Sequence, residues 1–293
     1  MKLGSAETHT VERMAHASRR IMNSCPLCGS EAIRELNLSH TVIWKCRANN
    51  CRLEFASPQP EDHVLERAYR TLLYPATGDS HPVMHEGTPD SVLREVLPQL
   101  EAPVGPLKGL RLLDYGCGRG QLSRIALELG LAPVGIEPDP VARNISTAKV
   151  GMSVYANLGE LRLREASTRF DLVILWNVIE HLREPWLELR EMCEFLHPGG
   201  QLLVSTMNTR CLRARIERGR WLIYQHPTHL YYFHRRSLKR VLCGSGFRRV
   251  QEWKPTIHYP HHGPLRRWFY GVSTVLGVSD GLYYLCSTAA ENV

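Results

Sequence analysis

A glycine-rich turn between an apolar run and a helical run constrains the fold of this 293-residue chain more than any other feature. Residues 110–115 are mostly apolar and predict a buried strand, while residues 121–129 predict a helix. Gly116, Gly118 and Gly120 stand between them, at every second position. Glycine accepts positive φ and lets the backbone approach a ligand closely, and the start of a helix offers free N–H groups. The segment therefore predicts a strand, a tight turn and a helix that together bind a small molecule.

The pattern after this turn alternates between apolar strands and helical segments. We expect further strands at residues 132–136, 153–155, 170–176, 201–206, 247–253 and 281–287. We expect further helices at residues 141–149, 186–195, 237–243 and 265–276. Such alternation predicts an α/β fold with a mostly parallel, Rossmann-like sheet and helices on both faces.

The length of the chain allows one large domain and a small module. We expect an N-terminal arm at 1–22, a cysteine-rich module at 23–60, a helical linker or cap at 61–108 and the Rossmann-like domain at 109–293. Hydrophobic residues make up 43% of the chain, which suffices for a sizeable core. The chain has neither a run of about 18 apolar residues nor a signal-like apolar stretch near its N-terminus, so we expect a cytoplasmic protein with no membrane partner.

An acidic residue follows the second strand of this pattern. Glu137 comes about twenty residues after the glycine turn, where a carboxylate can accept hydrogen bonds from both ribose hydroxyls of an adenosine cofactor. A dinucleotide turn reads Gly-x-Gly-x-x-Gly and binds a pyrophosphate. Here the glycines alternate instead, and Asp114 at the strand end would repel a pyrophosphate but suit a cationic sulfonium with an amino group. The pattern favours S-adenosylmethionine over NAD.

As a set, these motifs resemble those of class I S-adenosylmethionine-dependent methyltransferases. Residues 114–120 are similar to the first motif of that family, Glu137 to its ribose-binding acid, and residues 170–182 to its fourth strand and the loop that follows. Residues 196–200 resemble its Leu-x-Pro-Gly-Gly turn, and residues 229–238 a later motif of small-molecule members. The resemblance implies a seven-stranded sheet whose last strand is antiparallel.

The same resemblance, which covers about residues 88–290, implies which residues hold the donor. The first glycines of the turn would approach its methionine part, Glu137 its ribose and the loop after the third strand its adenine. The end of the fourth strand would line the cofactor edge, although Trp176 could equally be a core aromatic. The expected donor site comprises Asp114, Gly116, Gly118, Gly120, Glu137, Asn157, Leu158, Trp176 and Asn177.

A hydroxyl or carbon acceptor needs a base, and histidine is a common choice because its pKa lies near neutrality. The candidates are His181, after the fourth strand, and His226 and His229, in a segment rich in Tyr and Trp. Structural roles are the alternative: His181 could order its helix, and His229 could be a hydrogen-bond partner. The histidines within residues 258–262 have metal-like spacing, but we expect an exposed loop there.

Four of the nine cysteines, Cys25, Cys28, Cys46 and Cys51, lie in the first quarter of the chain. Two cysteine pairs on two turns can close a tetrahedral site of four thiolates, which holds a structural zinc because no ligand position stays open for chemistry. The second pair is unusually wide, His40 is a spare ligand, and four unrelated thiols are the alternative. The arrangement resembles methyltransferases with an N-terminal zinc ribbon, including sugar C-methyltransferases of antibiotic pathways. It is more weakly similar to a ribosomal RNA guanine methyltransferase.

We therefore expect S-adenosylmethionine-dependent methyl transfer to an oxygen or carbon of a small molecule, in the biosynthesis of a specialised metabolite. The alternative is an RNA methyltransferase, since a net charge of +7 and a zinc module would suit nucleic-acid binding. Against it, the chain has no Asn-Pro-Pro-Tyr motif for exocyclic amines and no Pro-Cys pair for a pyrimidine C5 nucleophile. A third reading is a non-catalytic module that only holds the cofactor.

Overall fold

The computed structural model describes residues 19–73, 88–257 and 279–288. Within these ranges, no helix is both long enough and apolar enough to cross a bilayer. The helix expected at 265–276 and the histidines at 258–262 lie outside the described residues.

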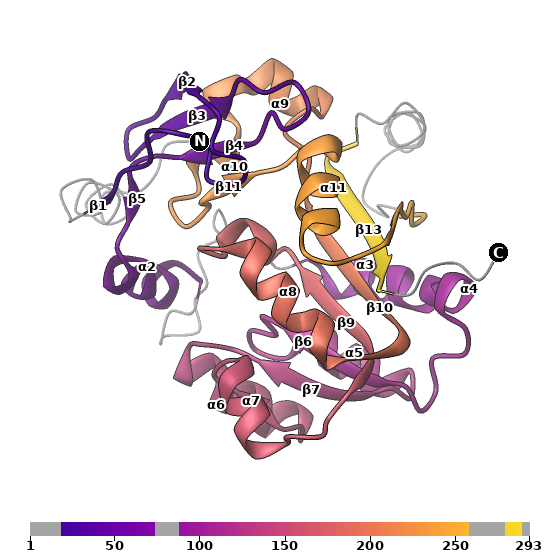
Figure 1. Cartoon of the computed structure of the whole chain (residues 1–293). Helices are drawn as coiled ribbons and strands as arrows, with labels where there is room; N and C mark the ends of the chain where they lie inside the picture. Colours follow the sequence, from indigo (N-terminus) through magenta and orange to yellow (C-terminus); the bar gives the residue numbers. More distant parts are fainter. Residues whose placement is uncertain (1–18, 74–87, 258–278, 289–293) are drawn as a thin grey trace.

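The larger sheet has seven strands in the order β12, β13, β10, β9, β6, β7 and β8 (Figure 1). These are β6 (Arg111–Tyr115), β7 (Ala132–Ile136), β8 (Val154–Tyr155), β9 (Phe170–Trp176), β10 (Leu196–Met207), β12 (Arg249–Glu252) and β13 (Gly281–Ser287). Strand β13 is antiparallel to both of its neighbours, whereas β8, β7, β6, β9 and β10 run parallel to one another. The expected fold class, with an antiparallel last strand, is confirmed.

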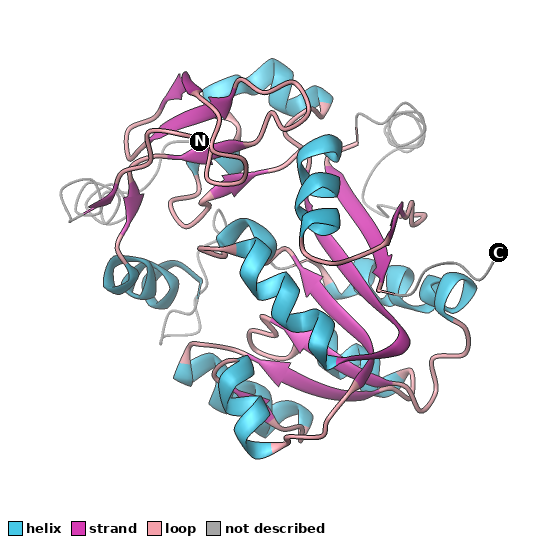
Figure 2. Ribbon diagram, viewed as in Figure 1, coloured by secondary structure: helices cyan, strands magenta, loops and turns pink. Residues whose placement is uncertain are grey.

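Helices cover both faces of this sheet (Figure 2). Strand β9 shows why, because its side chains alternate: Val173 and Leu175 pack into one hydrophobic core, and Leu172 and Ile174 into another. The first core is completed by α7 (Leu158–Arg164), α8 (Pro185–Phe195) and α11 (Arg235–Gly244). The second core is completed by α3 (Asp90–Val96), η2 (Leu97–Leu100) and α5 (Gln121–Glu128).

Local signals set the bounds of the predicted helices. Helix α6 (Pro140–Val150) begins where Asp139 accepts hydrogen bonds from two backbone N–H groups, and it ends at Gly151, which has a φ of 73°. The remaining helical turns are α2 (Asp62–Ala68), the π-helical η1 (Tyr69–Leu73), α4 (Glu101–Val104), η3 (Ile179–His181), α9 (Leu212–Glu217), η4 (Arg218–Arg220) and α10 (Leu222–Gln225).

The cysteine module forms an antiparallel sheet in the order β11, β4, β3 and β2. Its strands are β2 (Ala32–Asn37), β3 (Val42–Cys46), β4 (Glu54–Ala56) and β11 (Tyr231–Tyr232), while β1 (Arg19–Arg20) pairs separately with β5 (Gln59–Pro60). Strand β11 comes from the part of the chain assigned to the larger domain. The module and that domain therefore share one sheet, and the boundary at residue 60 stays a prediction.

Candidate active site

The glycine turn follows β6 and has the backbone conformation that its sequence predicts. Gly116, Gly118 and Gly120 have φ values of 79°, 54° and 79°. A Cβ atom at Gly116 would lie 2.6 Å from Cγ2 of Val178, and one at Gly120 would lie 2.5 Å from Oγ of Ser146. Both positions therefore require glycine, because of the backbone conformation and because neighbouring side chains fill the space.

Glu137 lies at the carboxyl end of β7, beside this turn. Its Oε2 accepts a hydrogen bond from the backbone N–H of Gly118 at 2.9 Å, and its Oε1 accepts one from the N–H of Asp139 at 2.8 Å. Glu137 is 5% exposed, and this burial raises the pKa of its carboxyl to about 7. The acid predicted to bind ribose is thus held against the glycine turn.

Asp114, which is also buried, lies at the end of β6. Its Oδ2 accepts a hydrogen bond from Oγ of Ser123 at 2.5 Å, and burial raises the pKa of its carboxyl to about 6. This contact joins the end of β6 to α5. The expected contact between Asp114 and the donor's amino group stays a prediction, since Ser123 is the carboxylate's observed partner.

The two residues expected beside adenine mark the start of α7. The exposed Asn157 is the N-cap of this helix, and its Oδ1 accepts a hydrogen bond from the N–H of Glu160 at 2.8 Å. Leu158 is buried in the core beside the sheet. Their role toward a ligand stays a prediction, and the helix that they begin was not predicted.

The end of β9 holds two further expected donor residues. The half-buried Trp176 donates a hydrogen bond from Nε1 to Oγ1 of Thr88 at 2.6 Å, and its ring centroid lies 5.6 Å from that of Tyr283. Asn177 has a φ of 54°, a conformation that a non-glycine residue adopts rarely and that often marks functional sites. Its N–H and Oδ1 both contact Oγ of Ser205.

The three candidate histidines form one cluster beyond the end of β9. The ring centroid of His181 lies 4.7 Å from that of His229 and 5.9 Å from that of His226, and the rings of His226 and His229 stack at 4.5 Å. The rings of His226 and His229 are buried within a loop that links α10 to β11. The structure therefore brings together all three residues that the sequence proposed as bases.

Hydrogen bonds indicate where the imidazole protons lie. Nδ1 of His229 is 2.8 Å from the carbonyl oxygen of Ile223, and Nδ1 of His181 is 3.1 Å from the carbonyl oxygen of Thr228. Because a carbonyl oxygen only accepts, Nδ1 of His229 carries a proton and its Nε2 is the basic nitrogen. Nδ1 of His181 also lies 3.2 Å from the Thr228 hydroxyl, which can donate as well as accept, and Nδ1 of His226 contacts the same hydroxyl at 2.8 Å.

Sequence reasoning did not single out three neighbours of this cluster. Glu180 is buried, and one ligand atom each of Glu180, His181 and His229 lie within 4.8 Å of one another, close enough to hold a cation together. Thr228 contacts His181 and His226. The ring centroid of Tyr69, in η1, lies 5.8 Å from that of His181. Only the adjacency of Glu180 to His181 could have drawn attention from the sequence.

Arg70 of the same π-helical turn contacts a residue that follows β7. Nε of Arg70 lies 3.3 Å from Oδ2 of Asp139, the residue whose N–H binds Glu137. The η1 turn therefore contacts His181, after β9, through Tyr69 and Asp139, after β7, through Arg70.

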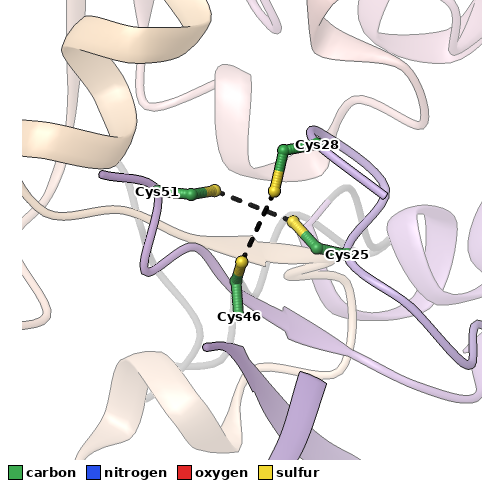
Figure 3. A group of neighbouring side chains, drawn as sticks. All are labelled: Cys25, Cys28, Cys46 and Cys51. Carbon is green, nitrogen blue, oxygen red and sulfur yellow. Dashed lines mark hydrogen bonds between the residues drawn. The ribbon is translucent and has the colours of Figure 1, made fainter. Parts of the chain in front are cut away.

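The four N-terminal cysteines converge on one point (Figure 3). The Sγ atoms of Cys25 and Cys51 are 3.7 Å apart, and those of Cys28 and Cys46 are 3.5 Å apart. The contact with Cys25 lowers the pKa of the Cys51 thiol, which favours the thiolate form that metal ions bind. His40 belongs to a pocket that His229 and Pro227 also line, rather than to the cysteine group.

Comparisons with known proteins agree on one family. The model of the methyltransferase domain matches residues 85–252. The ubiquinone biosynthesis O-methyltransferase of Cereibacter sphaeroides is 41% identical over 115 residues, which are 37% of this chain and 45% of that protein. Its namesake in Ruegeria pomeroyi is 36% identical over 127 residues, 41% of this chain and 51% of that protein. The chain thus spans about half the length of these curated relatives.

The fold is also found among solved structures. Phosphoethanolamine N-methyltransferase 2 of Haemonchus contortus, solved with S-adenosyl-L-methionine, superimposes with a TM-score of 0.53 at 16% identity. The match covers 81% of this chain and 63% of the other.

Proposed function

Because the chain belongs to the methyltransferase domain family, we propose that it transfers a methyl group from S-adenosylmethionine to a hydroxyl oxygen of a small molecule. Its seven-stranded sheet is the class I methyltransferase fold. One observation carries the proposal: the carboxyl ends of β6, β7 and β9 bring the glycine turn and Glu137 to the same edge of the sheet as the histidine cluster. Ligands bind at this edge in open α/β sheets. The printed names of the relatives support oxygen as the acceptor atom.

S-adenosylmethionine supplies an activated methyl group on a sulfonium. We assign its ribose to Glu137 and its methionine part to the backbone of the glycine turn. The carboxyl groups of Asp114 and Glu137 lie beside the glycine turn, and their ionised forms fit a cationic donor and oppose a pyrophosphate. We assign its adenine to Asn157 and Leu158, and the cofactor edge to Trp176 and Asn177.

The histidine cluster is assigned to the acceptor. A hydroxyl becomes a stronger nucleophile when a base takes its proton, and the imidazoles of His181 and His229 are the bases that the cluster offers. Thr228 and Ile223 fix both rings through their carbonyl oxygens. We assign proton removal to one of these two histidines and a positioning role to His226, which stacks on His229.

We also infer that the cysteine cluster holds a structural zinc ion. With Zn–S bonds of about 2.3 Å, a tetrahedral site spaces its sulfurs by about 3.8 Å, close to the two observed distances. Four cysteine ligands leave no position for a substrate, so the ion would stabilise the module without entering the reaction. His234 links this site to the larger domain: it caps α11, and its Nε2 lies 3.2 Å from the carbonyl oxygen of Arg52.

Transfer of a labelled methyl group to a panel of phenols and catechols, detected by mass spectrometry, tests the proposed activity. The expected result is one O-methylated product with release of the demethylated donor. Calorimetry with S-adenosylhomocysteine is run beside it, because it reports the donor site without needing an acceptor. If folded protein released no binding heat with S-adenosylhomocysteine, the proposal would be overturned.

A further inference from the structure

The segment between β10 and β11 concentrates positive charge. Residues 208–225 contain five arginines and a single acidic residue, Glu217. The net charge of this segment is +4, more than half of the +7 of the whole chain. The five arginines, all exposed, are Arg210, Arg213, Arg215, Arg218 and Arg220.

Apolar side chains stand among these arginines. Ile216 is 68% exposed, Leu222 is 49% exposed and Leu212 is 37% exposed. Leu212 and Ile216 lie four residues apart and therefore share one face of α9, while Cys211 and Ala214 on the other side are buried. Trp221 and Tyr224 anchor the same segment in a core that includes β3 and β4. The exposed apolar side chains are therefore presented by a packed element, and the core does not need them.

We propose that the segment formed by α9, η4 and α10 binds the surface of an anionic lipid bilayer. Aliphatic side chains flanked by arginines match such a surface, because the apolar groups enter the boundary of the acyl chains and the guanidinium groups meet the headgroup phosphates. A nucleic acid would use the arginines but leave the three aliphatic side chains in water. The earlier expectation of no membrane partner rested on the lack of a spanning run and did not consider a surface that only the fold assembles.

The same segment continues directly into His226 and His229. One short stretch of chain thus connects the segment formed by α9, η4 and α10 to the histidine cluster. If the proposed function holds, this connection would bring an amphiphilic acceptor near the proposed base. Binding to vesicles does not require methyl transfer, so failure of one proposal is distinguishable from failure of the other.

Co-sedimentation of the full chain with vesicles tests the proposal. Vesicles of phosphatidylcholine with about 30 mol% phosphatidylglycerol should bind the protein at least tenfold more strongly than pure phosphatidylcholine. Ile216→Asp and Leu222→Asp should each lower binding about tenfold, since a charge replaces an aliphatic group that enters the bilayer. Arg215→Gln with Arg220→Gln should lower it by about fivefold per arginine and reduce its salt dependence.

Leu163→Asp is the matched control. Leu163 is the most exposed of the large apolar side chains described, at 87%, and it lies on α7, at the opposite end of the molecule from α9 (Figure 1). This variant should bind vesicles as the wild type does. Each variant must keep the circular-dichroism spectrum and the thermal unfolding midpoint of the wild type, which shows that it is folded.

Several outcomes would overturn the proposal, in three groups. The first is equal binding to neutral and anionic vesicles, or none to either. The second is an equal loss in Leu163→Asp and Ile216→Asp. The third is evidence for another partner. Either the wild type is a dimer that Ile216→Asp converts to a monomer, or an RNA duplex displaces the vesicles and binds the Ile216→Asp variant with wild-type affinity.

Discussion

The carboxylate of Glu137 accepts a hydrogen bond from the backbone N–H of Gly118, with 2.9 Å between Oε2 and N. This contact fixes the glycine turn after β6 to the end of β7, so the two halves of the proposed donor site are coupled before any ligand binds. Burial raises the pKa of the carboxyl to about 7, which places its change of charge near neutrality.

Donor affinity should therefore depend on pH through Glu137. Only the carboxylate can accept hydrogen bonds from ribose hydroxyls with both oxygens, so protonation weakens binding. With a pKa of about 7, the affinity for S-adenosylhomocysteine should fall about tenfold between about pH 8 and about pH 6. Glu137→Gln should bind weakly at both pH values, and calorimetry should show a flat profile. An equal decline in Glu137→Gln would assign the pH dependence to another group.

The same shift predicts how the stability of the ligand-free protein changes with pH. The folded-state pKa lies above the ordinary 4.5, so the unfolded state binds fewer protons between these values, and the contribution of Glu137 to stability is lost as pH rises from about 4.5 to about 7. The Glu137→Gln variant has no carboxyl at this position and does not lose this stability as pH rises. The free energy of unfolding of the variant minus that of the wild type should therefore increase by about 2 kcal/mol between about pH 5 and about pH 8. Urea unfolding measures this difference, and a difference that stays constant would contradict the assignment.

Gly116→Ala should weaken both folding and donor binding. The new Cβ would lie 2.6 Å from Val178, at a φ of 79° that strains any residue with a side chain. We expect a loss of about 1–3 kcal/mol and at least tenfold weaker donor binding. Gly151→Ala is the matched control, because Gly151 has a φ of 73° but no atom near the added Cβ. It should cost about 1 kcal/mol and leave donor affinity unchanged.

Adding Val178→Ala to Gly116→Ala separates the two causes. The steric part of the loss should be recovered, while the strain of positive φ should remain. No recovery at all would show that Val178 is not the obstacle.

Much of the larger sheet could be predicted because its signals are local. The apolar run at β9 and the glycine that ends α6 determine structure only within a few residues of their own positions. The observed bounds of α5, α6, α8 and α11 accordingly lie within two residues of the predicted ones. Strand β10 was predicted to begin at residue 201 but begins at Leu196, because Leu196 already pairs with Phe170 of β9; residues 197–200 interrupt the register before pairing resumes at Gln201.

The parts that escaped prediction depend on contacts between distant residues. Strand β11 is two residues long, and only its pairing with β4 makes it a strand. Tyr69 meets His181 across more than a hundred residues of sequence, and no periodicity marks such a contact. The orientation of Asp114 could not be predicted either, since its partner Ser123 is one of several polar residues near the start of α5.

Replacement of a module cysteine should remove a zinc ion and unfold the module. Cys51→Ser should lower the zinc content, measured by metal analysis, from one ion per chain to near zero. The loss of metal-linked stability should amount to several kcal/mol, because such binding energy is folding energy. Cys243→Ser, at an exposed cysteine outside the cluster, should keep both the zinc and the stability. Zinc retained in full by Cys51→Ser would remove Cys51 from the ligand set.

Substitution of the proposed bases should slow transfer without weakening donor binding. We expect His181→Ala or His229→Ala to lower kcat by about a hundredfold or more, the usual contribution of a positioned base. The affinity for S-adenosylhomocysteine should change less than about twofold, since the proposed donor site lies at the neighbouring strand ends. His63→Ala, at an exposed histidine on α2, should behave as wild type. Wild-type turnover in both His181→Ala and His229→Ala would exclude them as bases.

Tyr224→Phe should lower the free energy of unfolding by weakening a contact between the cysteine module and the larger domain. The Tyr224 hydroxyl donates a hydrogen bond to Oε2 of the buried Glu54 at 2.7 Å, and Nζ of Lys45 lies 3.2 Å from Oε1 of the same carboxylate. Without the hydroxyl, one oxygen of a buried charge loses its donor, which should cost about 1–2 kcal/mol.

The sign of the pH dependence makes this last prediction specific. Burial already raises the pKa of Glu54, and loss of the Tyr224 donor raises it further. The cost of Tyr224→Phe should therefore be full where Glu54 is ionised and shrink as the pH falls and Glu54 becomes protonated in the folded state. Tyr155→Phe is the control, because Tyr155 donates to Glu165 at the same 2.7 Å in a more exposed place, where the bond should contribute less than about 1 kcal/mol. If both variants lost the same free energy of unfolding at every pH, the charge of Glu54 would not contribute to the contact between the module and the larger domain.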